Sequence, residues 1–211
     1  MKLQIAIDLA DSSTVLDIVD QIYDVIDIVE IGTPMIIKEG MSAVRKVKEK
    51  YPQVTVLADT KIVDGGSLEC GDVCKAGADI VTVLAVSDDE TITDVVKTAH
   101  QYGKKAMADL ISVEDIGTRA RKLKELGIDY IAVHTGVDMQ KQGKTPLGDL
   151  KELVKAVPST MCAVAGGVKL ETLDQYVQVR PEIIIAGGSL AGAEDVRKAA
   201  LEMKRKMDGQ E

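Results

Sequence analysis

Three ionisable side chains stand within six positions of one another in a short stretch of the sequence. Residues 57–66 read LADTKIVDGG and carry Asp59, Lys61 and Asp64 after an apolar run and ahead of a glycine pair. Carboxylates beside an ammonium group can bind a divalent cation or stabilise a developing oxyanion. A solvated surface loop could carry the same charges, so the interpretation depends on what ends the other apolar runs.

Ionisable residues also end several of these other runs. Asp8, Glu30, Asp109 and His134 follow apolar segments in the first, second, fifth and sixth of them. A single acid at such a place is more typical of a helix cap or a loop, and a single histidine is as typical of a structural role as of a catalytic one. Their recurrence at equivalent places indicates a shared functional site, provided that the fold brings these places together.

Eight short apolar runs predict eight strands. They are residues 3–9, 25–32, 54–61, 79–86, 105–111, 129–136, 160–168 and 182–190. The segments between them have helical spacing and charged outer faces, as in 119–127 and 148–157. Strands alternating with helices indicate parallel βαβ units, and eight of them predict a (β/α)₈ TIM barrel formed by residues 1–211 as one domain. A doubly wound open sheet is the alternative, but a glycine-rich nucleotide turn is missing after the first run.

A barrel would gather the polar run ends at one mouth, because active sites of this fold lie at the C-terminal ends of the strands. Side chains two positions apart in a strand share a face, so Asp59 and Lys61 should both point there. Five of the first six predicted strands then each place an ionisable group at the C-terminal mouth of the barrel. This agreement favours an active site over scattered surface charges.

Glycine pairs follow the last two predicted strands. Gly166 and Gly167 end the seventh run, and Gly187 and Gly188, followed by Ser189, end the eighth. Phosphate sites of this fold are commonly built by these two loops, where backbone N–H groups can approach an anion. Two simple tight turns are the alternative. We expect a phosphorylated ligand.

The predicted pocket is rich in carboxylates. Four of them would share it with Lys61 and His134, and clustered carboxylates raise one another's pKa unless a cation is present. Oxygen ligands without a Cys/His cluster favour Mg²⁺ or Mn²⁺ over zinc. We expect one metal ion, held mainly by Glu30 and Asp59. Cys70 and Cys74, four apart in a predicted helix, are expected to be buried free thiols rather than a metal pair.

The composition narrows the class of protein. The 211 residues are 45% hydrophobic and 28% charged, without Trp or Phe, which suits an aliphatic core around buried parallel strands. A net charge of −8 without a basic stripe argues against nucleic acid or anionic membrane as partners. No run approaches the ~18 apolar residues of a membrane span. In the N-terminal sequence MKLQIAIDLAD an acidic residue follows after only a short apolar run, unlike in a signal peptide. We expect a cytoplasmic protein.

Two further segments are less informative. His100 lies near a predicted helix end and is expected at the surface. Residues 137–146, VDMQKQGKTP, follow the sixth strand without clear periodicity. They form either a mobile loop over the site or a polar connection, and both interpretations stay open.

Over its whole length the chain resembles the orotidine 5′-phosphate decarboxylase suprafamily and, within it, the 3-hexulose-6-phosphate synthases. The Asp-x-Lys-x-x-Asp pattern at residues 59–64 is the most specific part of the resemblance. The segments that carry it are AIDLAD (6–11), VEIGTP (29–34), LADTKIVDGG (57–66), MADLI (107–111), AVHTGVDMQ (132–140), AVAGGVKLETL (163–173) and IIAGGSLAGAEDV (185–196).

The resemblance implies an assembly and a ligand set. It implies a homodimeric barrel in which Asp64 reaches into the neighbouring subunit's site. It also implies Mg²⁺ on Glu30 and Asp59, and a substrate phosphate on the last two glycine loops.

The resemblance further implies a reversible aldol condensation of formaldehyde with D-ribulose 5-phosphate through a magnesium-stabilised enediolate, giving D-arabino-3-hexulose 6-phosphate. In that reaction His134 would be the base for the C1 proton and Lys61 would stabilise the enediolate oxygen. Asp8 and Asp109 would position hydroxyl groups, while Asp64 would hold Lys61.

Alternatives remain within and outside this group. Decarboxylases of 3-keto-L-gulonate 6-phosphate are similar, but typically carry Glu at the place of Asp109 and Arg at the places of Val137 and Gly188. A non-catalytic sugar-phosphate binder would not need Lys61 and His134. Ribulose-phosphate epimerisation usually uses several histidine ligands, and this chain offers one plausible site histidine.

Overall fold

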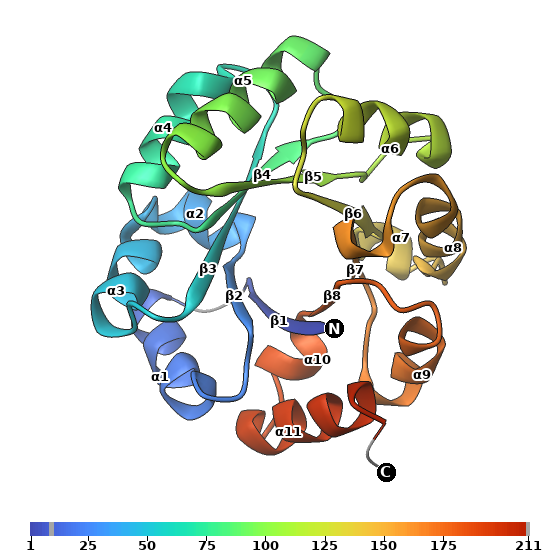
Figure 1. The fold of residues 1–211 in the computed structure, drawn as a ribbon. Helices are drawn as coiled ribbons and strands as arrows, with labels where there is room; N and C mark the ends of the chain where they lie inside the picture. Colours follow the sequence, from blue (N-terminus) through green and yellow to red (C-terminus); the bar gives the residue numbers. More distant parts are fainter. Residues whose placement is uncertain (9–10, 210–211) are drawn as a thin grey trace.

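The computed structural model describes residues 1–8 and 11–209, and within them eight parallel strands close into a barrel (Figure 1). The strands pair in chain order, and β8 returns to pair with β1. They are β1 (Lys2–Ile7), β2 (Ile28–Ile31), β3 (Thr55–Ile62), β4 (Ile80–Leu84), β5 (Lys105–Asp109), β6 (Tyr130–His134), β7 (Cys162–Ala165) and β8 (Ile183–Ala186). The predicted (β/α)₈ barrel is therefore confirmed, and the open sheet is wrong.

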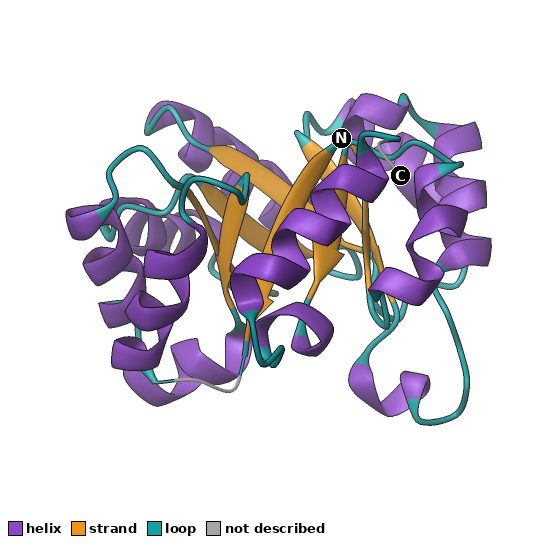
Figure 2. Cartoon of the chain, turned by 90° about the horizontal axis from the view of Figure 1, so that it is seen from below, coloured by secondary structure: helices purple, strands orange, loops and turns teal. Residues whose placement is uncertain are grey.

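Helices surround this barrel as an outer ring, which the side view of Figure 2 shows around the central strands. They are α1 (Ser12–Ile22), α2 (Thr33–Glu39), α3 (Ser42–Lys50), α4 (Gly66–Lys75), α5 (Asp89–Gln101), α6 (Ile116–Glu125), α7 (Val137–Gln140), α8 (Leu147–Ala156), α9 (Leu173–Val177), α10 (Gly188–Ala191) and α11 (Val196–Met207). Two short 3₁₀ helices, Ser159–Met161 and Leu170–Thr172, complete the connections. Within the described ranges, no helix combines the length and the hydropathy needed to pass through a bilayer.

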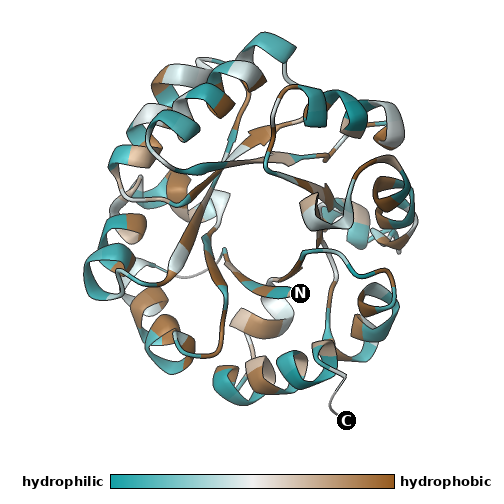
Figure 3. Cartoon of the chain, in the orientation of Figure 1, coloured by the Kyte–Doolittle hydropathy of each residue, from teal (hydrophilic) through white to brown (hydrophobic). Residues whose placement is uncertain are grey.

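Apolar side chains fill two regions, one on each side of the barrel wall. The larger core lies between the strands and the helices, and Figure 3 shows the more hydrophilic residues toward the outer sides of the helices. The smaller cluster fills the barrel interior. It consists of Ala6, Ile28, Leu57, Ile80, Met107, Tyr130, Ala132, Ala163, Ala165, Ile183 and Ile185. With both faces buried, the strands show continuous apolar runs, as expected for a parallel barrel.

The predicted strands are all present, but several end earlier than the apolar runs. β7 stops at Ala165 and β8 at Ala186, so both glycine pairs lie in the loops that follow. The first run was expected to extend to residue 9, which lies outside the described residues, and β1 ends at Ile7. These shorter strands place the polar residues at the rim of the barrel.

Local signals explain several helix boundaries. Asp11 caps α1 by accepting the N–H groups of Ser13 and Thr14, at 3.1 and 2.8 Å. Gly103 and Gly127 adopt φ values of 67° and 88°, as needed after a helix end. Asp115 accepts the N–H of Thr118 at 2.9 Å and caps α6.

A repeated aspartate joins consecutive strands at the N-terminal end of the barrel. Asp27, Asp79 and Asp129 directly precede β2, β4 and β6. Each carboxylate accepts the backbone N–H of a residue in the preceding strand, at 2.7, 3.0 and 2.9 Å. Each also contacts a basic side chain from the outer layer, so the acid joins two strands to the surrounding helices.

Asp79 has the most partners of the three. It accepts hydrogen bonds from Lys48 and Lys104 at 2.8 and 2.7 Å, as well as from the Val56 N–H. Burial alone would raise the pKa of Asp79, but the hydrogen bonds from Lys104, Lys48 and Val56 outweigh it and lower the pKa below its ordinary value of 3.8. The ionised carboxylate therefore stabilises the folded barrel.

We expect Asp79→Asn to lower the free energy of unfolding at neutral pH by about 1–2 kcal/mol, because two ion pairs lose their negative partner. A depressed folded-state pKa contributes stability that is complete above the unfolded value and is lost as the pH falls through the folded one. The difference between wild type and variant in urea unfolding should therefore shrink below pH 3.8. Asp72→Asn, which removes an exposed ion pair with Lys75, is the matched control and should change little. A difference for Asp79→Asn that persists unchanged in acid would contradict this account.

Candidate active site

A bulge near the end of β3 places Lys61 beside Asp59. The pairing of β3 with β4 shifts register between Ala58 and Ile62, and Lys61 has a φ of 49°, which is rare for a residue with a side chain. The hydroxyl of Thr82 accepts the Lys61 N–H at 2.9 Å and donates to Asp59 Oδ1 at 2.9 Å. Thr82 thus fixes both members of the pair, and the local backbone conformation is maintained by its neighbours.

The Lys61 ammonium group lies between two buried carboxylates. Its Nζ contacts Asp59 Oδ2 and lies 3.5 Å from Asp109 Oδ2. Burial lowers the pKa of Lys61, but the charges of Asp59 and Asp109 outweigh burial and raise it overall. The Thr33 hydroxyl lies 2.8 Å from Asp59 Oδ2 and 2.7 Å from the Asp59 backbone oxygen. Lys61 is therefore held protonated at the mouth of the barrel.

Asp109 connects this pair to His134. His134 Nδ1 lies 2.9 Å from Asp109 Oδ2, and Asp109 Oδ1 accepts the Ile111 N–H at 2.9 Å. Burial would raise the pKa of Asp109, but the hydrogen bond from His134 and the charges of His134 and Lys61 lower it. An ionised Asp109 orients the imidazole through Nδ1, while Nε2 makes no hydrogen bond to the described residues.

Glu30 lies beside this array in the barrel interior and is 9% exposed. Its Oε2 accepts a hydrogen bond from Gln4 Nε2 at 2.5 Å. Burial and the nearby Asp59 carboxylate raise the pKa of Glu30 well above its ordinary value. A positive charge beside Glu30 would therefore stabilise its ionised form.

Asp8 completes the group of carboxylates, packed against a glycine. A Cβ at Gly32 would lie 2.0 Å from Asp8 Oδ1, so only glycine leaves space for this carboxylate. Burial and the Asp59 carboxylate raise the pKa of Asp8, whereas Lys61 and His134 lower it. The structure thereby brings together all the strand-end residues predicted to form the site, except Asp64.

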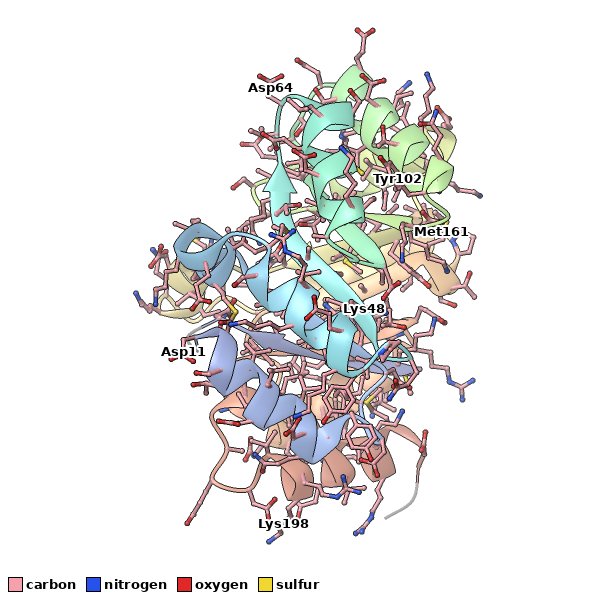
Figure 4. All side chains as sticks on the ribbon, turned by 90° about the vertical axis from the view of Figure 1, so that its left-hand side faces the viewer. Asp11, Lys48, Asp64, Tyr102, Met161 and Lys198 are labelled. Atoms are coloured by element: carbon pink, nitrogen blue, oxygen red, sulfur yellow. The ribbon has the colours of Figure 1, made fainter. Side chains whose placement is uncertain are left out.

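Asp64 lies outside the array. It is exposed, its Oδ1 accepts the Gly65 N–H at 2.7 Å, and Figure 4 shows it at the outer edge of the molecule beyond β3. A hollow of about 610 Å³ is lined by Asp64, by the small residues at the start of α4 and by acidic residues around the start of α5, not by Lys61 or His134. Val63 and Leu68, on either side of Asp64, are 57% and 71% exposed.

The two glycine loops lie after β7 and β8, as predicted. Gly166 has a φ of 101°, and a Cβ there would lie 2.3 Å from the Thr135 oxygen, so this glycine is needed for contact with the end of β6. Gly167 also has a positive φ of 72°. Gly187 precedes α10 and Gly188 begins it. The Ser189 hydroxyl donates to the Val168 oxygen at 2.7 Å, which joins the two loops.

The segment after β6 contains a short helix that its sequence did not indicate. Residues 137–140 form α7, and Gln140 Nε2 donates to the Thr135 oxygen at 2.7 Å. His100 is exposed, as expected, and its Nε2 lies 2.9 Å from Asp129 Oδ2.

The oxygen donors fit a divalent cation of the Mg²⁺ type. Glu30 and Asp59 are buried carboxylates, and the charge of Asp59 contributes to the raised pKa of Glu30. Residues 1–8 and 11–209 contain no cluster of three or more His, Cys, Asp or Glu side chains arranged around a common metal position. This is compatible with Mg²⁺, which is usually held by one or two carboxylates together with water and substrate. Cys70 and Cys74 are buried free thiols with sulfur atoms 3.9 Å apart, as the sequence indicated.

Three supporting residues were not identified from the sequence: Gln4, Gly32 and Thr82. Gln4 and Thr82 are polar residues inside otherwise apolar strands, a signal that could have found them. Gly32 follows β2 directly, but its contact with Asp8 depends on the register between β1 and β2.

Comparisons with known proteins place the chain among sugar-phosphate enzymes. Residues 1–203 match the model of the "Orotidine 5'-phosphate decarboxylase / HUMPS family". A 3-hexulose-6-phosphate synthase of Bacillus subtilis is 43% identical, over 97% of this chain and 98% of its own. The solved 3-hexulose-6-phosphate synthase of Salmonella typhimurium superposes with a TM-score of 0.96 at 39% identity, over the full length of both chains. The solved KGPDC of Streptococcus mutans has the same barrel fold, with a TM-score of 0.91 at 22% identity over 99% of this chain and 97% of its own.

We expect Thr82→Val to destabilise the protein by about 1–3 kcal/mol, since Asp59 Oδ1 loses its donor and the Lys61 N–H loses its acceptor. Thr82→Ser keeps the hydroxyl and is the matched control. Chemical unfolding of the two variants and the wild type would measure the difference. If Thr82→Ser lost as much stability as Thr82→Val, the loss would not depend on the hydroxyl, and the role assigned to the hydroxyl would be wrong.

Proposed function

Because this chain belongs to the orotidine 5'-phosphate decarboxylase / HUMPS family and is an enzyme of the 3-hexulose-6-phosphate synthase kind, we propose that it joins formaldehyde to D-ribulose 5-phosphate. The product would be D-arabino-3-hexulose 6-phosphate, in a reversible aldol reaction. The observation that carries this proposal is the protonated Lys61 between Asp59 and Asp109, with His134 held on Asp109. An acid–base group and an anion-stabilising group are what enediolate chemistry requires.

His134 is the proposed base. Asp109 holds Nδ1, which leaves Nε2 to take the proton from C1 of the sugar. The electron pair of the broken C–H bond then forms the enediolate, and C1 makes the new bond to the carbon of formaldehyde. The formaldehyde oxygen receives a proton as the product forms. General base catalysis of this type typically contributes about 10²–10⁴-fold to the rate.

Lys61 is the proposed stabiliser of the enediolate oxygen. Its charge is preserved by the adjacent carboxylates, and Thr82 and the bulge fix its position before substrate arrives. A preorganised donor in a water-poor site stabilises developing charge without reorganisation at the moment of reaction. Asp8 and Asp109 are proposed to position the hydroxyl groups of the sugar.

Glu30 and Asp59 are proposed to hold a Mg²⁺ ion, with Mn²⁺ as a possible substitute. The raised pKa of Glu30 supports a positive partner there, because burial and the Asp59 charge both penalise its ionised form. When bound, such an ion supplies Lewis-acid polarisation of the ketose carbonyl.

The phosphate of the substrate is proposed to bind at the loops after β7 and β8. Gly166, Gly167, Gly187 and Gly188 give backbone N–H groups access to an anion. The hydroxyl of Ser189 bonds the Val168 oxygen, so in this arrangement it supports the loops, and it would have to rotate to bind the phosphate itself.

Decarboxylation of 3-keto-L-gulonate 6-phosphate is the weaker candidate. The solved decarboxylase of Vibrio cholerae with that activity in its name is 25% identical to this chain, against 43% for the Bacillus subtilis synthase. Asp109, Val137 and Gly188 also stand where the decarboxylases typically differ.

We further propose a homodimer in which Asp64 of one subunit completes the site of the other and holds its Lys61. Within its own chain Asp64 is exposed and forms no ion pair with the described residues. The exposed apolar side chains of Val63 and Leu68 beside it support a contact surface at this edge.

The direct test is formaldehyde consumption by the purified protein with D-ribulose 5-phosphate and Mg²⁺. We expect rapid loss of formaldehyde that EDTA abolishes and added Mg²⁺ restores. Lys61→Met should reduce kcat by about 10²–10³-fold, because a preorganised charge is lost. Lys38→Met, on the surface of α2, is the matched control and should keep full activity. No consumption by the wild type, together with CO₂ release from 3-keto-L-gulonate 6-phosphate, would replace the proposed reaction with the alternative.

Shared sites can be tested by mixing two inactive variants. Lys61→Met and Asp64→Asn homodimers are each expected to be nearly inactive. After subunit exchange we expect about a quarter of the wild-type activity, because half of the dimers are hybrids and each hybrid has one intact site. A mixture that stays inactive although mass spectrometry detects hybrids would show that Asp64 acts within its own subunit.

A further inference from the structure

Gln4 is the one residue with a buried, unpaired side-chain polar atom among the described parts of the chain. The atom is its amide oxygen, Oε1, and the residue is fully buried. Gln4 lies in the middle of β1, opposite Ile28 of β2 and Ile185 of β8 in the strand register. Both neighbours belong to the apolar cluster of the barrel interior, so the amide stands in an apolar environment.

This arrangement is costly for the fold. A buried acceptor without a donor costs about 1–3 kcal/mol, whereas an apolar side chain of similar length would avoid that cost. The other end of the same amide makes a short contact, from Nε2 to Glu30 Oε2 at 2.5 Å. The benefit of an amide at this position therefore lies in its contact with Glu30.

The register shows how the contact is made. Glu30 lies opposite Ala6, two residues further along β1 than Gln4 and closer to the C-terminal mouth. Gln4 thus reaches Glu30 from the deeper side of the barrel. The Gln4 amide donates to Oε2 of Glu30, while the other carboxylate oxygen of Glu30, Oε1, has no hydrogen bond to the described residues.

We propose that Gln4 is a positioning residue that holds the Glu30 carboxylate in place for a divalent cation. The inference rests on the proposed cation site at Glu30 and Asp59. An amide suits this role because it donates a hydrogen bond without adding charge, so the full negative charge of Glu30 is left for the cation. A lysine at the same place would neutralise Glu30 and compete with the cation.

Gln4→Met is the informative variant, because methionine has a similar length and no donor. We expect about 10–100-fold weaker binding of Mn²⁺ to the substrate-free protein, measured from the signal of free Mn²⁺ in electron paramagnetic resonance. Thermal unfolding without metal should change little, because the gain from removing the unpaired oxygen offsets the loss of the hydrogen bond to Glu30 Oε2. Reduced affinity without reduced stability separates positioning from a merely structural role.

Four further variants complete the experiment. Ile185→Met changes the same layer of the barrel on the other side of Gln4 and should bind Mn²⁺ like the wild type. Glu30→Gln should bind poorly, and adding Gln4→Met to it should have no further effect, because the two residues act as one unit. Gln4→Leu replaces Gln4→Met if the latter does not fold.

The outcomes distinguish this inference from the function on which it rests. Equal Mn²⁺ affinity of Gln4→Met and wild type, with weak binding by Glu30→Gln, would overturn the role of Gln4 and leave the cation site intact. Additive losses in the double variant would also overturn it. If neither wild type nor Glu30→Gln binds Mn²⁺, the cation site and the positioning role both fall.

Discussion

The site depends on a single ammonium group placed among buried carboxylates. Asp59, Asp109 and Glu30 are all less than a tenth exposed, and carboxylates in such a place are stable as anions only with positive partners. Lys61 supplies one charge within the protein, bonded to Asp59 and close to Asp109. Among the residues that the structure describes, Glu30 has only a neutral amide as its hydrogen-bond partner. This imbalance of charge supports the proposal that a cation and an anionic reaction intermediate bind at the same mouth of the barrel.

The position of Lys61 follows from a departure from regular strand geometry. A register shift and a positive φ turn the end of β3, and the hydroxyl of Thr82 stabilises both the turned backbone and Asp59. A regular strand would have needed no such support. The strained conformation thus lies where the proposed chemistry occurs, and a neighbouring strand maintains it.

The sequence was sufficient for the architecture but not for the supporting contacts. Eight apolar runs separated by helical segments predict the barrel. Because active sites of this fold lie at the C-terminal ends of the strands, the barrel in turn predicts one rim that contains Asp8, Glu30, Asp59, Lys61, Asp109 and His134. Thr82, Gln4 and Gly32 could not be assigned in this way, because their contacts depend on register and side-chain direction across two strands. The two-residue spacing correctly predicted that Asp59 and Lys61 lie together. The bulge in β3 that places them there has no clear signal in the sequence. Asp64 was expected in the site of a second subunit, and a single chain places it only at the surface.

The aspartates at the opposite end of the barrel divide the fold into pairs of strands. Asp27, Asp79 and Asp129 join β1 to β2, β3 to β4 and β5 to β6, and no equivalent carboxylate contact joins β2 to β3 or β4 to β5 among the described residues. For circular permutation, this means that the connections after β2 and β4 are suitable places for new chain ends. A break there would leave every joined pair continuous, whereas a break between β1 and β2 would separate a strand from the carboxylate that holds it. The barrel can thus be treated in engineering as exchangeable two-strand modules rather than as eight equal repeats.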